Sequence, residues 1–440
     1  MRDRITLLII ILVLWTFLIT FPIYVPKYPA LVLILGFIIA YTILFNIAER
    51  HQRRKNKKNP PKIDESYRPF VTIMIPAHNE QAVIAETVEN IASIDYDNYE
   101  IIVIDDRSDD KTAEVLLELE KQNGSKVKAL IRDKDAFPGK SAVLNDAFEI
   151  SKGDVICVFD ADARVEPDFL KKIIPNLAPK EVGAVQARKV ISNREHNFLT
   201  RCQDNEYVLD SYFQFGRDAI KGAVELRGNG ELIKREAIED VDGWNNYTIV
   251  DDLDLSTRLH LKGWDIRFCR DVCVYEEGVK DFFPLIRQRR RWVEGSIRRY
   301  LDYFIDVLFS KDMSIRVSLD MYAYIAEFLL PVWLISECAL QSMWFFDGNP
   351  NHMLSSFMMI GVIGVFFFVG LLYSLRKYNK LSIWQTIKQS AETGVYLVTL
   401  WTPIVIFIVF KIIFVKRSMD WGKTSHGEIP EEVSSELKAS

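Results

Sequence analysis

Short apolar runs alternate with stretches of helical spacing through the middle of the chain. The runs predict strands, most of them buried on both faces, at residues 71–76, 99–104, 127–131, 155–159 and 182–188. The helical spacing predicts helices at residues 82–91, 112–122, 140–150, 167–176 and 198–215. This alternation is typical of an α/β fold with a doubly wound, mostly parallel sheet.

Both ends of the chain are much more apolar than the middle. Residues 5–25 and 29–47 are almost uncharged, and each is close to the ~20 residues that cross a bilayer as a helix. A signal peptide is the alternative for the first run, but no small-residue cleavage site precedes Pro22 and a second run follows closely. The basic block at residues 51–58 predicts that this side of the membrane is the cytoplasm.

Three further segments have the character of membrane spans, at residues 319–346, 354–375 and 393–415. The last of them conflicts with the rule that cytoplasmic loops are basic. Arg376 and Lys377 place the end of the preceding segment inside, so the last segment should end outside, yet Lys416 and Arg417 follow it. A re-entrant or tilted helix broken at Pro403 would resolve this conflict, and the sequence does not decide whether one forms.

Residues 297–308 place Ile297, Leu301 and Ile305 on one face of a helix. This spacing predicts an amphipathic helix in the membrane interface, with an ordinary helix packed on the soluble domain as an equal alternative. The predicted organisation is two transmembrane helices (1–50), a basic linker (51–68), an α/β domain (69–296), an interfacial helix (297–316), about three membrane segments (317–417) and a polar tail (418–440).

Composition excludes several classes of site. The net charge of −5 over 440 residues provides no global basic field for a nucleic acid. The five cysteines form no paired C-x-x-C array, so neither a zinc site nor a disulfide framework is expected. Reduced cysteines are typical of a cytoplasmic domain.

Two carboxylates follow the run at residues 155–159, at Asp160 and Asp162. The last residues of a parallel strand lie at the carboxyl edge of the sheet, where open α/β sheets bind ligands. If the backbone stays extended through Ala161, both side chains point the same way and can hold a hard divalent cation with its diphosphate. The alternative is a turn that caps the next helix, and on this motif alone that alternative is stronger.

Further motifs lie at the ends of the predicted elements. They are Pro76-Ala77-His78-Asn79-Glu80, Asp105-Asp106, Gly139-Lys140, Val250-Asp251-Asp252 and Gln288-Arg289-Arg290-Arg291-Trp292. Together with Asp160 and Asp162, and in this order, they resemble the family 2 glycosyltransferases over residues 69–292, about half of the chain. The resemblance implies a GT-A fold, in the cytoplasm, between N-terminal and C-terminal transmembrane helices.

The same resemblance implies how a sugar nucleotide is bound. Asp105 or Asp106 would contact the uracil, with a turn cap as the alternative role for this pair. Lys140 would face the phosphates from a helix N-terminus. Asp162 would bind Mg²⁺ (or Mn²⁺), with Asp160 as its partner toward the metal and the ribose.

The remaining roles concern the base and the acceptor. Related membrane synthases have Thr-Glu-Asp with the final Asp as general base, which corresponds to Asp252 here. Because this chain has Val-Asp-Asp instead, Asp251 is a competitor, and an N-cap of a helix at 253–261 is the alternative for Asp252. Gln288 and Arg291 match the Gln-x-x-Arg-Trp signature and would contact the donor, and Trp292 would contact the acceptor.

Longer stretches resemble the cyanobacterial β-monoglucosyldiacylglycerol synthases, among them Glu225-Leu226-Arg227-Gly228-Asn229-Gly230 and the run from Arg291 to Tyr303. This implies an inverting, UDP-sugar-dependent transfer of a hexose, glucose, to diacylglycerol at a bacterial cell membrane. A processive polysaccharide synthase, with a growing glycan as acceptor, is the first alternative. A membrane protein that binds sugar nucleotides without catalysis is the second.

Overall fold

The computed structural model describes residues 5–13, 43–48, 66–324 and 350–415, and the isolated positions 16, 50–52, 54–55, 328 and 332. Its contacts divide the chain into two units. The sheet unit contains Lys62–Gln203 and Val224–Gln288, and the helical unit contains Asp204–Ala223, Arg289–Ser418 and the N-terminal residues up to Pro61.

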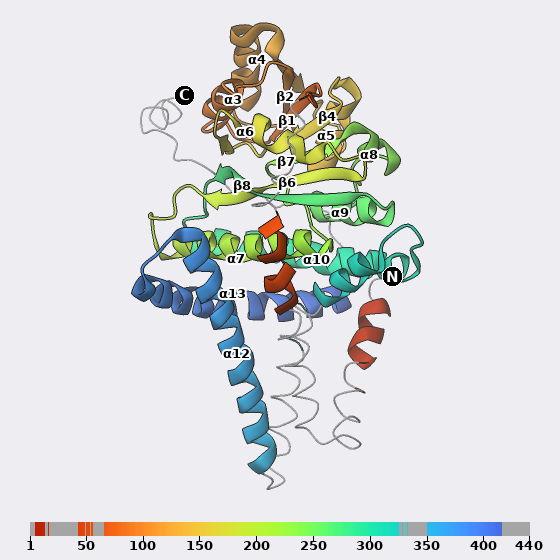
Figure 1. Ribbon diagram of the computed structural model, residues 1–440. Coiled ribbons are helices and arrows are strands. Elements are labelled where there is room, and N and C mark those ends of the chain that lie inside the picture. The colour runs from red at the N-terminus through yellow and green to blue at the C-terminus, as the bar shows by residue number, and fades with distance from the viewer. Residues whose placement is uncertain are drawn as a thin grey trace. The chain divides into compact units, whose positions relative to one another are not determined.

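The sheet unit is built on an eight-stranded sheet with the order β3-β2-β1-β4-β7-β6-β8-β5 (Figure 1). The strands are β1 Val71–Ala77, β2 Tyr99–Asp105, β3 Val127–Ile131, β4 Val155–Val158, β5 Arg164–Val165, β6 Val182–Ile191, β7 Glu231–Lys234 and β8 Asp265–Glu276. The five strands predicted from the apolar runs are all present. β5, β7 and β8 are additional.

The sheet is mixed rather than fully doubly wound. β1 pairs in parallel with β2 and β4, as do β2 with β3 and β6 with β8. β7, however, lies antiparallel between β4 and β6, and β5 is antiparallel to β8. The prediction of a mostly parallel sheet is therefore confirmed, although it did not include these antiparallel strands. The sequence did not predict the direction of β7, because a strand of four residues has no periodicity that indicates its direction or its neighbours.

Helices cover the sheet at α3 Ile84–Ala92, α4 Thr112–Asn123, α5 Lys140–Ile150, α6 Phe169–Ile173, α8 Arg235–Asp240 and α9 Asp251–Leu261. Alternate residues of β1, such as Ile73 and Ile75, pack with Ile84 and Val88 of α3 in one buried core. The helix predicted at 167–176 ends early and continues as a 3₁₀ turn, where Pro175 offers no N–H for a further α-helical bond.

Four long helices supply most of the described helical unit. They are the later parts of α7 Phe198–Ile220 and α10 Phe282–Phe309, with α12 Pro350–Asn379 and α13 Ile383–Phe414. α10 corrects the predicted start of an interfacial helix at residue 297, because it continues without a break through that position. Arg298 and Arg299 are also buried, at 1% and 2% exposure, so the side of α10 that carries them does not face solvent.

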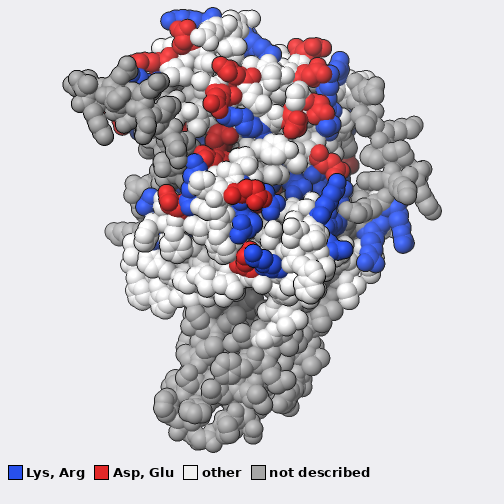
Figure 2. Space-filling model, turned by 90° about the vertical axis from the view of Figure 1, so that its left-hand side faces the viewer, with Lys and Arg blue, Asp and Glu red and all other residues white. Residues whose placement is uncertain are grey.

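Among the residues described, α13 is the helix that is long and apolar enough to cross a membrane. The predicted spans at 5–25, 29–47 and 319–346 lie largely outside the described residues, and the tail at 418–440 lies wholly outside them. In Figure 2, acidic and basic side chains gather over the sheet unit, whereas much of the described surface of the helical unit is uncharged.

Candidate active site

The carboxyl edge of the sheet brings Lys140 to Asp160. Lys140 is the first residue of α5, after Gly139, whose φ of 109° an L side chain would rarely adopt. From there its Nζ donates to Asp160 Oδ1 at 2.7 Å, just beyond β4. Although burial lowers the pKa of Lys140, the carboxylates of Asp160 and Asp251 more than offset this and raise it, so the lysine is a fixed cation.

A glycine turn at Gly228-Asn229-Gly230 lies against the same lysine. Lys140 Nζ donates to the carbonyl oxygen of Gly228 at 2.8 Å, and Asn229 Oδ1 accepts from the backbone N–H of Asp160 at 3.2 Å. Gly228 has a φ of 72°, and a Cβ there would lie 3.2 Å from Asp252 Oδ2. Glycine therefore lets this backbone approach Asp252 closely, and the turn brings Lys140, Asp160 and Asp252 around one point.

Asp251 and Asp252 open α9. The N-cap is Val250, so the N-cap interpretation of Asp252 is wrong: the helix begins at Asp251, two residues before the predicted start. Asp252 Oδ1 accepts from the N–H of Leu253 at 2.8 Å, whereas Asp251 Oδ2 is buried with no hydrogen-bond partner in the described part of the chain. Burial, and then the charge of Asp251, raise the pKa of Asp252 to about 6, against the opposing effect of Lys140.

The two aspartates at the end of β2, Asp105 and Asp106, differ in their partners. Asp106 accepts from Arg107 Nε at 2.9 Å and from Arg132 Nη1 at 2.5 Å, and both its oxygens are bonded. Asp105 Oδ2 accepts from the N–H of Ser108, while its Oδ1 is buried and has no partner among the described residues. Asp106 thus uses both carboxylate oxygens to stabilise its own loop, whereas Asp105 has one carboxylate oxygen that can still accept a hydrogen bond from a ligand.

The carboxylates predicted to hold a metal lie on either side of Ala161. Asp160 pairs with Lys140, and Asp162 Oδ2 accepts from the N–H of Glu277 at 2.9 Å. No group of three or more acidic, His or Cys side chains with metal-binding geometry occurs in the described ranges. Two carboxylates nevertheless fit Mg²⁺ or Mn²⁺, because Mg²⁺ is usually held by one or two carboxylates, waters and the phosphates of its substrate.

The signature on α10 is divided between the two units. Gln288 is the last residue of its stretch of the sheet unit, and Arg291 and Trp292 belong to the helical unit. There the buried Arg289 donates to Glu206 at 2.9 Å and its guanidinium lies 4.0 Å from the ring centroid of Trp292. The structure thus gathers Lys140, Asp160 and Asp252 in one unit and gives Trp292 a cationic neighbour in the other.

Glu231 is a site residue that the sequence interpretation missed. It is the first residue of β7, fully buried, and its Oε2 accepts from the N–H of Gly228 at 3.0 Å. Its Oε1 has no hydrogen-bond partner among the residues described. Burial, and then the charge of Asp252, raise its pKa to about 8, with Lys140 opposing. A glutamate directly before the apolar pair Leu232-Ile233 was the signal available.

The pH dependence of stability should report the protonation of Glu231. Its pKa is raised on folding, so its stabilising contribution is complete below the unfolded value near 4.5 and is lost as the pH rises to about 8. Glu231→Gln, which stays neutral, should therefore lose less apparent Tm between pH 5 and pH 8 than the unchanged protein. Thermal unfolding in detergent measures this, with the exposed Glu118→Gln as control. Parallel curves for all three proteins would contradict the assignment.

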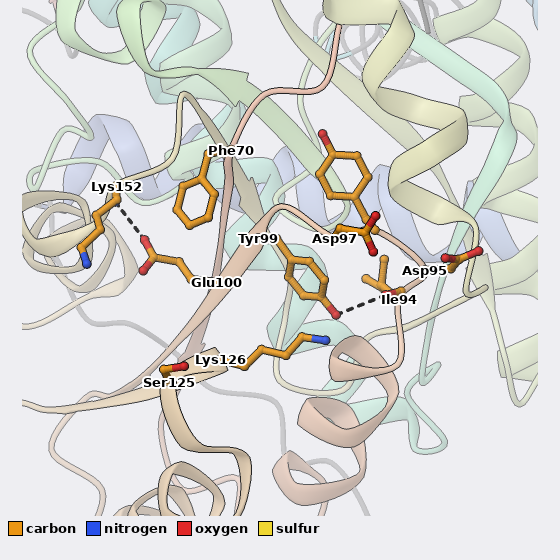
Figure 3. A pocket seen from close by; sticks show the side chains of 10 residues that line it. Phe70, Ile94, Asp95, Asp97, Tyr99, Glu100, Ser125, Lys126 and Lys152 are labelled. Carbon is orange, nitrogen blue, oxygen red and sulfur yellow. Dashed lines mark hydrogen bonds between the residues drawn. The ribbon is translucent and has the colours of Figure 1, made fainter. Parts of the chain in front are cut away.

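A cavity of about 570 Å³ lies elsewhere in the sheet unit (Figure 3). Its lining comes from the start of the strands and the loops before them, including Phe70, Tyr99, Lys126 and Lys152. Figure 3 shows Lys126 beside Tyr99, whose hydroxyl donates to the carbonyl of Ile94 at 3.3 Å. The cavity thus lies at the amino ends of β1 to β4, away from the edge that carries Asp105 and Asp160.

Comparisons of the sequence with known proteins identify the family to which the chain belongs. A family model described as "Glycosyltransferase like family 2" matches residues 68–295. The chain is 37% identical to a "Beta-monoglucosyldiacylglycerol synthase" of Trichormus variabilis, over 81% of this chain and 76% of that protein. It is also 37% identical to the protein of the same name from Synechocystis sp., over 84% and 78%.

Similarity extends to a more distant relative and to a solved structure. The chain is 30% identical to a "Probable glycosyltransferase YdaM" of Bacillus subtilis, over 62% of this chain and 66% of that protein. The mannosyltransferase PcManGT from Pyrobaculum calidifontis, solved with GDP-Man and Mn²⁺, aligns with a TM-score of 0.57 at 19% identity. That alignment covers 86% of this chain and 98% of the other, and at this identity it shows a shared fold.

Proposed function

The chain is a family 2 glycosyltransferase with a GT-A-like fold, and we propose that it transfers glucose from UDP-glucose to diacylglycerol with inversion. The observation that carries the proposal is the turn at Gly228, which lies against Asp252 and accepts from Lys140. Because Lys140 also binds Asp160, a base, a cation and a metal-binding carboxylate would lie around one turn.

The donor would be bound along the carboxyl edge of the sheet. Asp105, with its free oxygen, is better placed than Asp106 to accept from the N–H of a uracil. Lys140 would neutralise the diphosphate from the N-terminus of α5. Asp160 and Asp162 would hold Mg²⁺ or Mn²⁺, which when bound stabilises the charge that develops on the leaving UDP.

Asp252 would act as the general base. A carboxylate with a pKa of about 6 is ionised at neutral pH and remains basic enough to accept the proton of a hydroxyl as that hydroxyl attacks. One base with direct displacement inverts the anomeric centre, because no carboxylate is needed as a nucleophile. Asp252, whose carboxylate lies against the glycine turn, is a stronger choice for the base than Asp251.

A lipid is the acceptor that best fits the relatives and the surface of the helical unit. Both cyanobacterial relatives carry the name of a diacylglycerol glucosyltransferase. Large apolar side chains are also exposed along α10, α12 and α13, where a bilayer would cover them. We keep Gln288 and Arg291 as proposed donor contacts and Trp292 as a proposed acceptor contact, in a membrane enzyme whose sheet unit faces the cytoplasm.

The product identifies the reaction. Membranes containing the protein should convert radiolabelled UDP-glucose into a chloroform-soluble product that mass spectrometry identifies as one hexose on a diacylglycerol. UDP-galactose, UDP-N-acetylglucosamine and GDP-mannose are the competing donors to compare. Label in a water-soluble polymer alone would contradict the lipid acceptor in favour of a polysaccharide synthase. No transfer from any donor, with UDP still bound, would favour a non-catalytic binding protein.

A further inference from the structure

α13 has two different faces. The side chains that it buries include Thr386, Ser390, Thr393, Tyr396, Leu397, Leu400, Ile404, Val405, Ile408 and Ile412. The large apolar side chains that it exposes, at 36–78%, are Ile383, Trp384, Ile387, Val395, Val398, Phe407, Phe410 and Phe414. Each half of the helix, before and after Pro403, thus has one face packed on protein and one uncovered apolar face.

Polar contacts fasten the buried face to α7 and α10. Asn205 of α7 donates to Thr393 at 3.0 Å, and Tyr396 donates to Glu206 at 3.0 Å. Farther along, Lys411 donates to Glu294 of α10 at 2.6 Å. Thr393 and Lys411 are about 27 Å apart along a helix. The side chains of α7 and α10 therefore hold a length of α13 that is nearly as long as the hydrocarbon core of a bilayer is thick, ~30 Å.

The helices that hold α13 are rich in charge. Glu294 pairs with Arg298 of α10 as well as with Lys411, and Arg289 pairs with Glu206. If α13 crossed the hydrocarbon core, this network would have to enter the core with it, and charged side chains at the centre of a bilayer are costly. In Figure 1, α13 runs across the helical unit beside α7 and α10, whereas α12 extends away from it.

We propose that α13 does not cross the membrane but lies along its cytoplasmic surface, with its exposed apolar face in the acyl chains. Large apolar side chains are also exposed on the other helices of this unit, at Leu308 and Phe309 of α10 and at Val365 and Val369 of α12. α12 packs against α13 and contains the span predicted at residues 354–375, which favours lipid over a second protein as the occupant.

This arrangement also removes the conflict in the charge pattern. Arg376 and Lys377 lie near the end of α12 and Lys416 and Arg417 follow α13. If α13 spans the membrane, these two basic pairs lie on opposite sides. If it lies on the surface, both lie in the cytoplasm, as the positive-inside rule requires. Exposed Lys388 of α13 adds a cation that suits anionic headgroups.

Depth measurements along α13 test the proposal. In the full-length chain with its five natural cysteines replaced, single cysteines at Trp384, Val395 and Phe410 are spin-labelled and reconstituted into phosphatidylcholine–phosphatidylglycerol vesicles. Oxygen and nickel-chelate accessibilities then give the depth of each label. We expect one similar, shallow depth at all three positions and a deeper label at Val365 of α12, the internal control.

Two results would overturn the proposal. Trp384 and Phe410 are about 39 Å apart along a helix, so in a spanning helix Val395 would be deep and the other two shallow. Labels in water at all three positions would instead show that lipid does not cover this face. As a second measurement, cysteines at Ser382 and Val415 should react with an impermeant maleimide from the same side of sealed vesicles. Reaction from opposite sides would also exclude a surface helix, whether or not the protein transfers sugar.

Discussion

Asp252→Asn should abolish sugar transfer while the protein stays folded and still binds UDP. Asparagine keeps the shape of the side chain and the acceptor for the N–H of Leu253, but it cannot take a proton at neutral pH. We expect kcat to fall by at least ~1,000-fold, which corresponds to about 4 kcal/mol in the activation barrier. Initial rates of glycolipid formation and calorimetric titration with UDP measure the two halves of this expectation.

Asp251→Asn is the matched control, because it changes the neighbouring carboxylate on the same turn of α9. We expect a smaller loss of activity and a lower pKa for Asp252, since one of the charges that raise this pKa is removed. In the unchanged protein kcat/KM should rise with pH through about 6, as Asp252 ionises, and in Asp251→Asn this rise should occur at lower pH. If Asp251→Asn is inactive and Asp252→Asn is active, Asp251 and not Asp252 is the general base.

Asp162→Asn should have the second-largest effect. Asparagine retains an oxygen to accept from the N–H of Glu277, so the local fold is kept while the negative charge toward the metal is lost. We expect a loss of ~1,000-fold in kcat, about 4 kcal/mol, because the leaving diphosphate would lose its cation. The exposed Asp135→Asn is the control and should leave the rate unchanged.

Measurements of nucleotide binding distinguish a metal-binding role of Asp162 from a purely structural role. Titration of the unchanged protein with UDP should show tighter binding when Mn²⁺ is present, and chelator should remove the gain. In Asp162→Asn the affinity for UDP should be low and indifferent to Mn²⁺. Full transferase activity of the unchanged protein in excess chelator would exclude a metal at Asp160 and Asp162.

Much of the α/β fold could be predicted because its signal is local. The predicted strand at 127–131 and helix at 140–150 have the observed bounds, since apolar periodicity and the glycine before Lys140 act within a few residues. The prediction was weaker where a segment has no such period. β7 is four residues long and β5 two, and their pairing depends on which longer strands leave an edge open.

The membrane pattern shows the same limit. Apolarity marked residues 393–415 as a membrane segment, and the structure does contain a long apolar helix there, α13. Hydropathy sums the residues of a segment and does not record which face each one occupies. The contacts of Thr393, Tyr396 and Lys411 with α7 and α10 were therefore invisible, as was the continuous course of α10 through residue 297.

The sequence itself determined the order and chemistry of the motifs. Carboxylates and a lysine at the ends of strands and at the starts of helices are expected at one edge of the sheet, because parallel strands deliver their carboxyl ends there. The order of these motifs resembles the family 2 glycosyltransferases, and this resemblance implies the sugar-nucleotide site. Only the tertiary structure decided which members of each pair are available. Asp106 is bonded by Arg132, Asp105 is not, and Glu231 reaches Gly228 from β7. Burial and the charges of residues distant in the chain decide such questions, and neither is written in local spacing.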